Sequence, residues 1–119
     1  MDEPVLTRDG RVNLMGATCT KPPELQPRTG VKNLLLIHYP FWIDRLNGPK
    51  FDLVLAGHSH GGQVRLPFLG AVLVPGGVGR YDLGLFQTPA GLLYVGSGIG
   101  WFFANVRFNC RPEIAVFEI

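Results

Sequence analysis

Three histidines, His38, His58 and His60, are the residues best suited to chemistry in this chain. His58 and His60 lie two residues apart among glycines, and in an extended backbone their imidazoles would point to the same side. Neutral imidazole suits zinc, iron, nickel and manganese. The pair therefore favours a metal site. His38 taken alone gives a weaker signal, because a lone histidine after a strand is more often a hydrogen-bonded structural residue.

Two short apolar runs have to position these histidines. Residues 33–38 end in His38 and are cut off by Pro40, and residues 51–56 lead into the glycine-rich turn that holds His58. Continuous apolar runs of this length are typical of strands buried on both faces. Because layered α/β proteins project functional loops from the ends of such strands, we expect all three histidines to meet at one site.

The remaining elements are predicted to be short and mostly extended. Glycine weakens helices and proline ends them, and the chain holds 16 glycines and 10 prolines. Strands are expected at 12–16 and 113–119, a hairpin at 82–87 and 92–95, and extended pieces at 63–67 and 71–74. One or two helical turns are expected at 41–46, with Trp42, Ile43 and Leu46 on one face. Loops are expected at 17–30, 75–79 and 96–100.

Composition places the chain among folded proteins of ordinary charge. Hydrophobic residues make up 46% of its 119 residues and charged residues 17%, with a net charge of +2. The basic residues are scattered, so nothing indicates nucleic-acid binding. The longest apolar run is too short to span a bilayer. Cys19 and Cys110 belong to no C-x-x-C pair, and reduced structural thiols are the favoured interpretation.

A family resemblance rests on three segments of the sequence. Residues 57–63, Gly-His-Ser-His-Gly-Gly-Gln, resemble the G-H-[ST]-H-G-G-Q signature of calcineurin-like metallophosphoesterases. Residues 35–40 resemble the preceding motif of that family, a hydrophobic strand that ends in a metal-binding histidine. Residues 107–114 resemble the closing segment of its bacterial, membrane-associated, phosphodiesterase-like branch. The resemblance covers most of residues 12–119 in the correct order.

The resemblance implies a role for each signature residue. His38 and His58 would be ligands of one metal ion and His60 a ligand of a second, the two ions bridging a hydroxide that attacks a phosphomonoester or phosphodiester. Gly61, Gly62 and Gln63 would form the wall beside the second ion, on the substrate side or in contact with the ligands. No catalytic residue is assigned. The cofactors would be divalent ions, Mn, Zn, Fe or Ni.

The acidic half of that centre is absent from the sequence. The family carries D-x-H, G-D-x-x-D and G-N-H-[DE] motifs upstream, and none occurs here. Three imidazoles without a carboxylate cannot hold two divalent ions ~3.5–4 Å apart, because nothing offsets their repulsion. Relatives also commonly place acidic residues after the glycine that corresponds to Gly16, where this chain has Ala-Thr-Cys.

The expected architecture follows from the resemblance. It implies an α+β fold, the β-rich C-terminal half of a four-layer αββα sandwich, with residues 1–119 forming one partial domain. Half of a sandwich exposes a sheet face and strand edges, so a homo-oligomer or association with the missing N-terminal half is expected. The location would be cytoplasmic, or peripheral to a membrane in a longer native protein.

Two functional interpretations stay open on the sequence. One is a phosphoesterase whose site is completed by an N-terminal segment and whose substrate is a phosphate ester. The other is a non-enzymatic module that binds a single metal or oligomerises. Four arginines could meet a phosphate but are more often structural, namely Arg65, Arg80, Arg107 and Arg111. Five aromatic residues could floor a substrate pocket but are usually core, namely Tyr39, Trp42, Trp101, Phe102 and Phe103.

Overall fold

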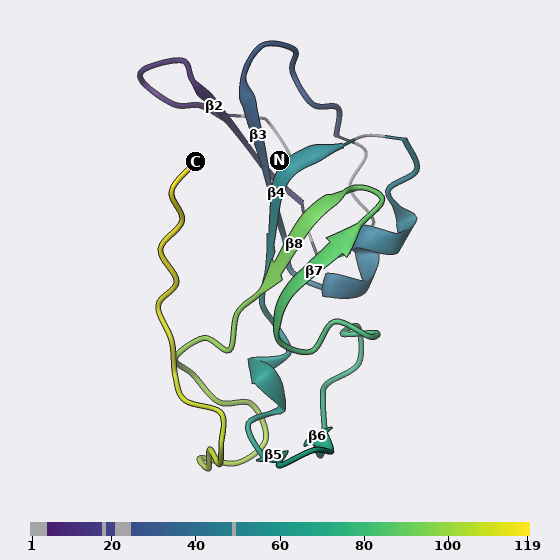
Figure 1. Ribbon diagram of the computed structural model, residues 1–119, viewed down its shortest axis with the longest axis vertical. Helices are drawn as coiled ribbons and strands as arrows, with labels where there is room; N and C mark the ends of the chain where they lie inside the picture. The colour runs from purple at the N-terminus through teal and green to yellow at the C-terminus, as the bar shows by residue number, and fades with distance from the viewer. Residues whose placement is uncertain (1–4, 18, 21–24, 49) are drawn as a thin grey trace.

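The computed structural model describes residues 5–17, 19–20, 25–48 and 50–119. Its main sheet has six strands in the order β1-β2-β3-β4-β8-β7, and a second sheet pairs β5 with β6 (Figure 1). The main strands are β1 (Val5–Leu6), β2 (Val12–Gly16), β3 (Lys32–Ile37), β4 (Phe51–Ala56), β7 (Gly84–Thr88) and β8 (Gly91–Val95). The short pair is β5 (Arg65–Leu66) and β6 (Gly70–Ala71). The regular helices of the described ranges are 3-10 turns, η1 (Pro40–Arg45) and η2 (His60–Gly62).

The centre of the main sheet is parallel. Strand β2 runs parallel to β3, β3 to β4 and β4 to β8, whereas β1 and β7 are antiparallel at the two edges. Parallel neighbours require crossover connections, and η1 lies on the crossover between β3 and β4. The result is a β-rich mixed sheet with little helix, which agrees with the α+β class expected from the sequence.

One face of the sheet forms the core with η1. Leu35, Val54 and Leu93 are fully buried at the centre of neighbouring strands, and Ile43 of η1 packs in the same cluster. Alternation along a strand sends the residues between them to the opposite face. That second face is less well covered, because Leu36 on β3 keeps 39% of its surface exposed. The expectation that this strand is buried on both faces is therefore wrong at Leu36.

Most predicted elements are confirmed. The strand at 12–16 matches β2 exactly, the runs at 33–38 and 51–56 correspond to β3 and β4, and the predicted hairpin is β7 and β8. Trp42, Ile43 and Leu46 are all buried, as expected of one face of η1. The described parts of the predicted loop at 17–30 hold no strand or helix, and residues 18 and 21–24 lie outside the described ranges.

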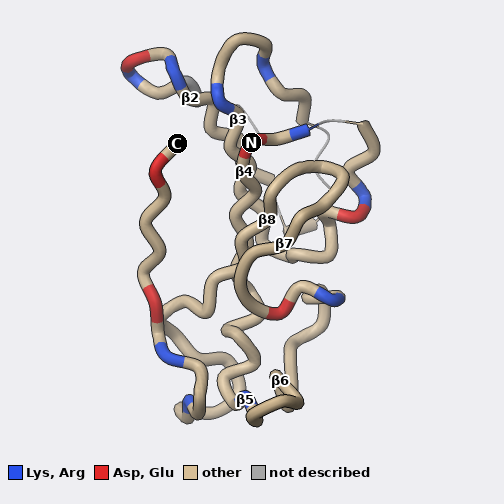
Figure 2. The backbone as a smooth tube through the Cα atoms, in the orientation of Figure 1, with Lys and Arg blue, Asp and Glu red and all other residues tan. Residues whose placement is uncertain are grey.

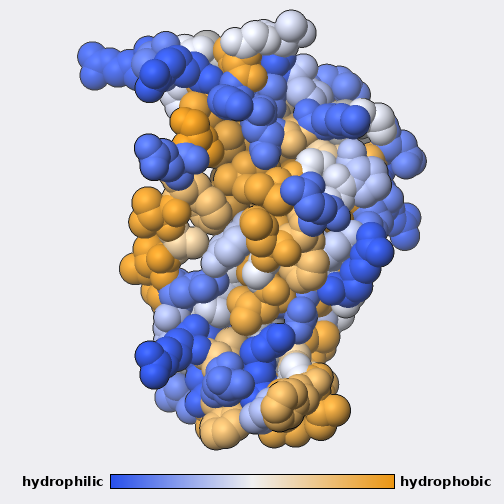
Figure 3. All heavy atoms as spheres, in the orientation of Figure 1, coloured by the Kyte–Doolittle hydropathy of each residue, from blue (hydrophilic) through white to orange (hydrophobic). Residues whose placement is uncertain are grey.

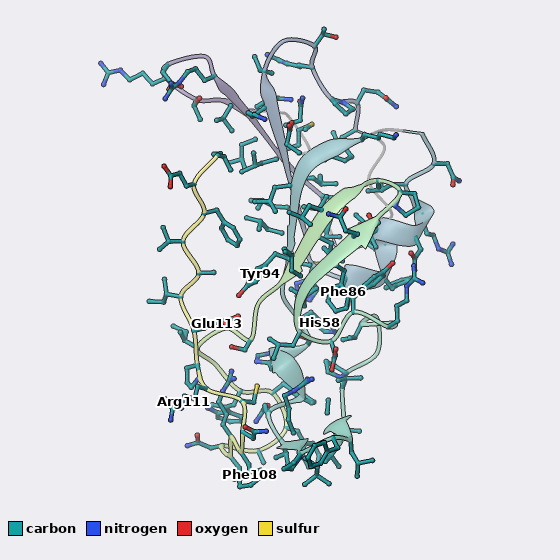
Figure 4. All side chains as sticks on the ribbon, in the orientation of Figure 1. His58, Phe86, Tyr94, Phe108, Arg111 and Glu113 are labelled. Atoms are coloured by element: carbon teal, nitrogen blue, oxygen red, sulfur yellow. The ribbon has the colours of Figure 1, made fainter. Side chains whose placement is uncertain are left out.

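The strand predicted at 113–119 is wrong. This segment runs alongside the sheet without joining it (Figure 1). It is anchored at Glu113, whose carboxylate accepts hydrogen bonds from Tyr94 Oη at 2.8 Å and from the Ser97 backbone at 2.7 Å (Figure 4). Phe117 then packs edge-on against Tyr94, with ring centroids 5.0 Å apart. Since β4 and β7 already occupy both sides of β8, this tail has no free strand edge there to pair with.

None of the described buried residues is charged. Figure 2 shows Lys and Arg scattered along the chain rather than gathered on one element. Of the described residues, none forms a helix long and apolar enough to cross a bilayer.

Two glycines of the β7–β8 hairpin provide a matched test of this packing. Both have positive φ, +133° at Gly91 and +97° at Gly84, but a Cβ at Gly91 would overlap the Phe51 carbonyl oxygen, whereas Gly84 has open space. We expect Gly84→Ala to cost about 1–2 kcal/mol through backbone strain alone. Gly91→Ala adds a clash with β4 and should cost about 2–5 kcal/mol.

Chemical denaturation of the two variants measures this difference. Equal losses in unfolding free energy would show that β8 is not packed against β4 at Gly91 as described.

Candidate metal centre

His38 and His58 meet where two neighbouring parallel strands end. Ile37, the last residue of β3, pairs with Ala56, the last residue of β4, so the two following segments leave the sheet at the same edge. The imidazole centroids of His38 and His58 lie 4.5 Å apart with the rings tilted by 52°. The expectation that the three histidines meet at one site is thus confirmed for His38 and His58.

Tyr39 fixes the relative position of the two imidazoles. Its ring stands edge-on to both, with centroids 4.6 Å from His38 and 4.6 Å from His58. On its other side it packs against buried Trp42 at 5.4 Å. Gly77 leaves room for it, since a Cβ there would collide with the Tyr39 ring. Tyr39 thus packs against both imidazoles and supports their position. Sequence reasoning missed this role, although Tyr39 directly follows His38.

A backbone carbonyl determines the tautomer of His58. Its Nε2 lies 2.8 Å from the carbonyl oxygen of Gly76. A carbonyl only accepts hydrogen bonds, so Nε2 carries the proton and the neutral ring has its lone pair on Nδ1. Metal-binding histidines commonly donate their second nitrogen to a carbonyl in this way. Figure 4 shows His58 beyond the ends of the strands of the main sheet.

The backbone between His58 and His60 is not extended, which corrects the sequence argument. Their φ angles are +66° and +49°, and Ser59 between them is helical. Ser59 is buried and its Oγ accepts a hydrogen bond from the Gly61 backbone at 3.1 Å. This tight turn directs His60 toward Phe102, whose ring centroid lies 5.4 Å away. The two signature histidines therefore do not present their rings as alternate residues of an extended strand would.

The signature glycines allow close packing behind the turn. At Gly61, φ is +60° and a Cβ would come within 2.5 Å of the Cys110 sulfur. Cys110 is buried and reduced, in line with the structural role predicted for it, whereas the thiol of Cys19 is also free but exposed. Gly62 is buried against Ala71 of β6. Neither glycine has a side chain to offer an ion, so both act by letting other segments approach.

Gln63 forms hydrogen bonds that hold a loop distant in the sequence, residues 102–106, against the histidine turn. Its Nε2 donates to the carbonyl oxygens of Ala104 at 2.6 Å and Val106 at 2.9 Å, and its Oε1 accepts from the Phe102 backbone at 2.6 Å. The side chain is almost fully buried. Through these bonds Gln63 holds Phe102 in contact with His60.

Three of the four candidate arginines have structural partners. Arg65 pairs with Asp82 at 2.7 Å and Arg80 with Asp44 at 3.3 Å. Arg107 donates to several carbonyl oxygens of the 97–100 loop, including that of Ser97 at 2.8 Å. These arginines hold loops together, which agrees with the structural role that the sequence favoured for them.

The expectation that the five aromatic residues belong to the core is wrong for two of them. Trp42 is buried, but Trp101 and Phe103 keep 57% and 78% of their surface exposed. They belong to a loop that ends next to His60, not to the layer between sheet and η1.

The histidine pair fits part of a metal site. A ligand imidazole must be neutral, and partial burial, followed by the nearby His58 and His60, lowers the pKa of His38 below its usual 6.5. Across the described ranges, no three His, Cys, Asp or Glu side chains converge to hold an ion. Asp44 and Asp82 are bound to arginines. The pair thus offers two nitrogen ligands and leaves the rest of a coordination sphere to other groups.

Comparison with known proteins finds curated relatives of this chain. No protein-family model matches the chain, and no solved structure matches it. It is 37% identical over 87 residues to the uncharacterized metallophosphoesterase YkuE of Bacillus subtilis, covering 73% of this chain and 30% of the relative. It is 33% identical over 110 residues to the phosphodiesterase YaeI of Escherichia coli, covering 92% and 40%.

A third relative has a more specific name. The chain is 36% identical over 91 residues to the UDP-2,3-diacylglucosamine pyrophosphatase LpxG of Chlamydia trachomatis, covering 70% of this chain and 27% of that protein. The chain thus spans less than half the length of each of these relatives. All three names describe enzymes that cleave a bond to phosphorus, which agrees with the histidine motif at the strand ends. The chain belongs to the calcineurin-like metallophosphoesterase family.

Proposed function

We propose that this chain supplies the histidine half of a two-metal centre in a phosphoester hydrolase. The observation that carries the proposal is the His38 and His58 pair, with ring centroids 4.5 Å apart at the ends of β3 and β4. Both rings can present a nitrogen to one ion. His60 packs against Phe102 instead of pairing with these rings, and we assign it to a second ion. This division, two imidazoles for one ion and one for the other, is the one that the family motif implies.

The chain's own residues prepare the ligands. The Gly76 carbonyl holds the proton of His58 on Nε2, leaving Nδ1 free, and the Tyr39 ring keeps the imidazole of His38 against that of His58. Because the two imidazoles are already held in place, little side-chain conformational entropy is lost when a metal ion binds. When bound, a pair of divalent ions makes water nucleophilic at neutral pH and offsets the negative charge of the phosphoryl oxygens. The ions would be Mn, Zn, Fe or Ni.

The carboxylates that such a centre needs would come from another segment. We place residues 1–119 in the C-terminal half of a four-layer αββα sandwich, as one partial domain. Support comes from the share of the relatives that the chain spans, 27–40% in the three described above, and from the missing acidic motifs. The incompletely covered face around Leu36 would then receive the second layer.

A second function is favoured by the same histidine pair. Two imidazoles without a carboxylate can hold one ion when a second copy supplies further ligands. Exposed apolar side chains such as Leu36 and Leu85 offer a surface for that association. In this form the chain would be an oligomeric metal-binding module without hydrolase activity. Light scattering at high protein concentration that shows a folded monomer would exclude it.

The substrate class follows from the relatives by analogy. One is named a phosphodiesterase and another acts, by name, on a diphosphate linked to a diacylated sugar. Both names describe cleavage of a bond to phosphorus. We therefore propose a phosphate mono- or diester as the substrate of the completed protein.

Zinc titration of histidine variants tests the proposed division of ligands. We expect His38→Ala and His58→Ala each to weaken Zn²⁺ binding by more than the roughly 10–100-fold that loss of a supporting residue costs. His60→Ala should change the first binding event much less, because its imidazole faces Phe102. Isothermal titration calorimetry at pH 7 measures all three. The opposite order, with His60→Ala the most damaging, would refute the division.

Hydrolysis of bis-p-nitrophenyl phosphate with Mn²⁺ tests the proposed activity. We expect no turnover by the 119-residue chain and measurable turnover by a form extended upstream in its gene, because the carboxylates are then present. In the extended form His58→Ala should abolish activity, whereas Arg8→Ala, an exposed change in the turn between β1 and β2 at the opposite end of the sheet, should not. Inactivity of both forms with metal bound would favour the non-enzymatic module.

A further inference from the structure

An apolar cavity lies directly beside the histidine turn. Its volume is about 180 Å³, and its walls are side chains of Val64, Val72, Leu73, Phe102, Phe103 and Val106 together with Gly62 and Gln63. No charged residue lines it. Apolar cavities of roughly 150 Å³ stay dry and accept molecules such as benzene. This cavity is therefore large enough for an aromatic ring or a short alkyl segment.

The cavity is connected to the proposed metal centre through shared residues. Gly62 and Gln63 belong to its wall and follow His60 in the chain. Phe102 lines the cavity and also packs against His60, with ring centroids 5.4 Å apart. A molecule bound in the cavity would thus lie one aromatic ring away from an imidazole expected to face the phosphate.

Hydrogen bonds hold the wall of the cavity in place. The three hydrogen bonds of Gln63 fix the backbone of residues 102–106, and Arg107 binds the preceding loop through the carbonyls of Ser97 and Gly100. Both ends of the Gln63 amide are thus bonded to the backbone of the cavity wall.

Apolar side chains are also exposed in the segments that form the cavity. Val72 and Phe103 of its wall expose 60% and 78% of their surfaces, and Trp101 next to Phe102 in the chain exposes 57%. Phe68 and Leu69 at the β5–β6 turn are also highly exposed. Figure 3 shows hydrophobic side chains gathered at the end of the molecule where β5 and β6 lie. A ligand with an apolar part longer than the cavity could continue over this surface.

We infer that this cavity binds the hydrocarbon chain of a phosphate-ester substrate while the phosphate lies at the histidines. The inference rests on the proposed function and narrows its substrate class to phosphoesters with an alkyl or acyl chain. Three observations support a hydrocarbon chain as the occupant: the uncharged wall, the size, and the contact with His60 through Phe102. The diacylated substrate in the name of the LpxG relative has the same chemistry.

Binding of two alkyl phosphates to the Zn²⁺-loaded 119-residue chain tests the inference. Hexyl phosphate and ethyl phosphate carry the same headgroup and differ by four methylenes. Burial gains roughly fourfold in affinity for each methylene removed from water. Because the cavity is partly open, we expect at least a tenfold tighter dissociation constant for hexyl phosphate, measured by isothermal titration calorimetry below its aggregation concentration.

Two variants at residues of similar exposure show whether the preference for hexyl phosphate arises in the cavity. Val72→Asn changes a cavity wall, and Leu85→Asn changes a residue on β7 outside it; the native side chains are 60% and 61% exposed. Neither adds charge, so both should leave ethyl phosphate binding unchanged. Val72→Asn should remove most of the hexyl preference and Leu85→Asn none of it.

Three outcomes would overturn the inference. They are equal binding of the two phosphates, equal effects of the two variants, and a dimer that Val72→Asn alone dissociates, which would make the cavity an interface between copies. If Zn²⁺ binding still depends on His38 and His58, the proposed function stands and only the cavity assignment fails. If hexyl preference is found without that Zn²⁺ dependence, the cavity assignment stands and the proposed metal centre fails.

Discussion

His38 and His58 lie side by side because β3 and β4 run parallel in a single register, with Ile37 opposite Ala56. A slip of one residue would move one histidine by ~3.3 Å along the sheet and turn its strand over. Leu35 and Val54, both fully buried and directly paired, oppose that slip since it would expose them to water. The positions of the two imidazoles are thus a consequence of core packing several residues away.

Beyond the sheet edge, the site depends on loops that bind one another. The Gly76 carbonyl reaches His58 from the loop before β7, and Gln63 holds residues 102–106 from the loop after β8. Gly61 allows the approach of Cys110. Segments from three parts of the chain therefore surround the histidine turn. This arrangement explains why the seven-residue signature contains Gly61, Gly62 and a buried glutamine.

The strands that carry the histidines could be predicted from the sequence, since continuous apolar runs ended by Pro or Gly are a local signal. The turn geometry at His58 and His60 could not, because positive φ at two histidines is imposed by the loops packed behind them. The tail at 113–119 has strand-like alternation but no free edge next to it on β8. Tyr39, Gly76 and the cavity beside Gln63 depend on long-range contacts, for which a single sequence holds no local signal.

The central claim is that His38 and His58 bind one ion and that His60 does not share it. Electron spin-echo envelope modulation of the chain loaded with one equivalent of Cu²⁺, an ion that imidazole binds well, counts the coordinated rings. The account predicts two imidazoles in the native chain and in His60→Ala, and one in His38→Ala. A single imidazole in the native chain, or loss of one on His60→Ala but not on His38→Ala, would contradict it.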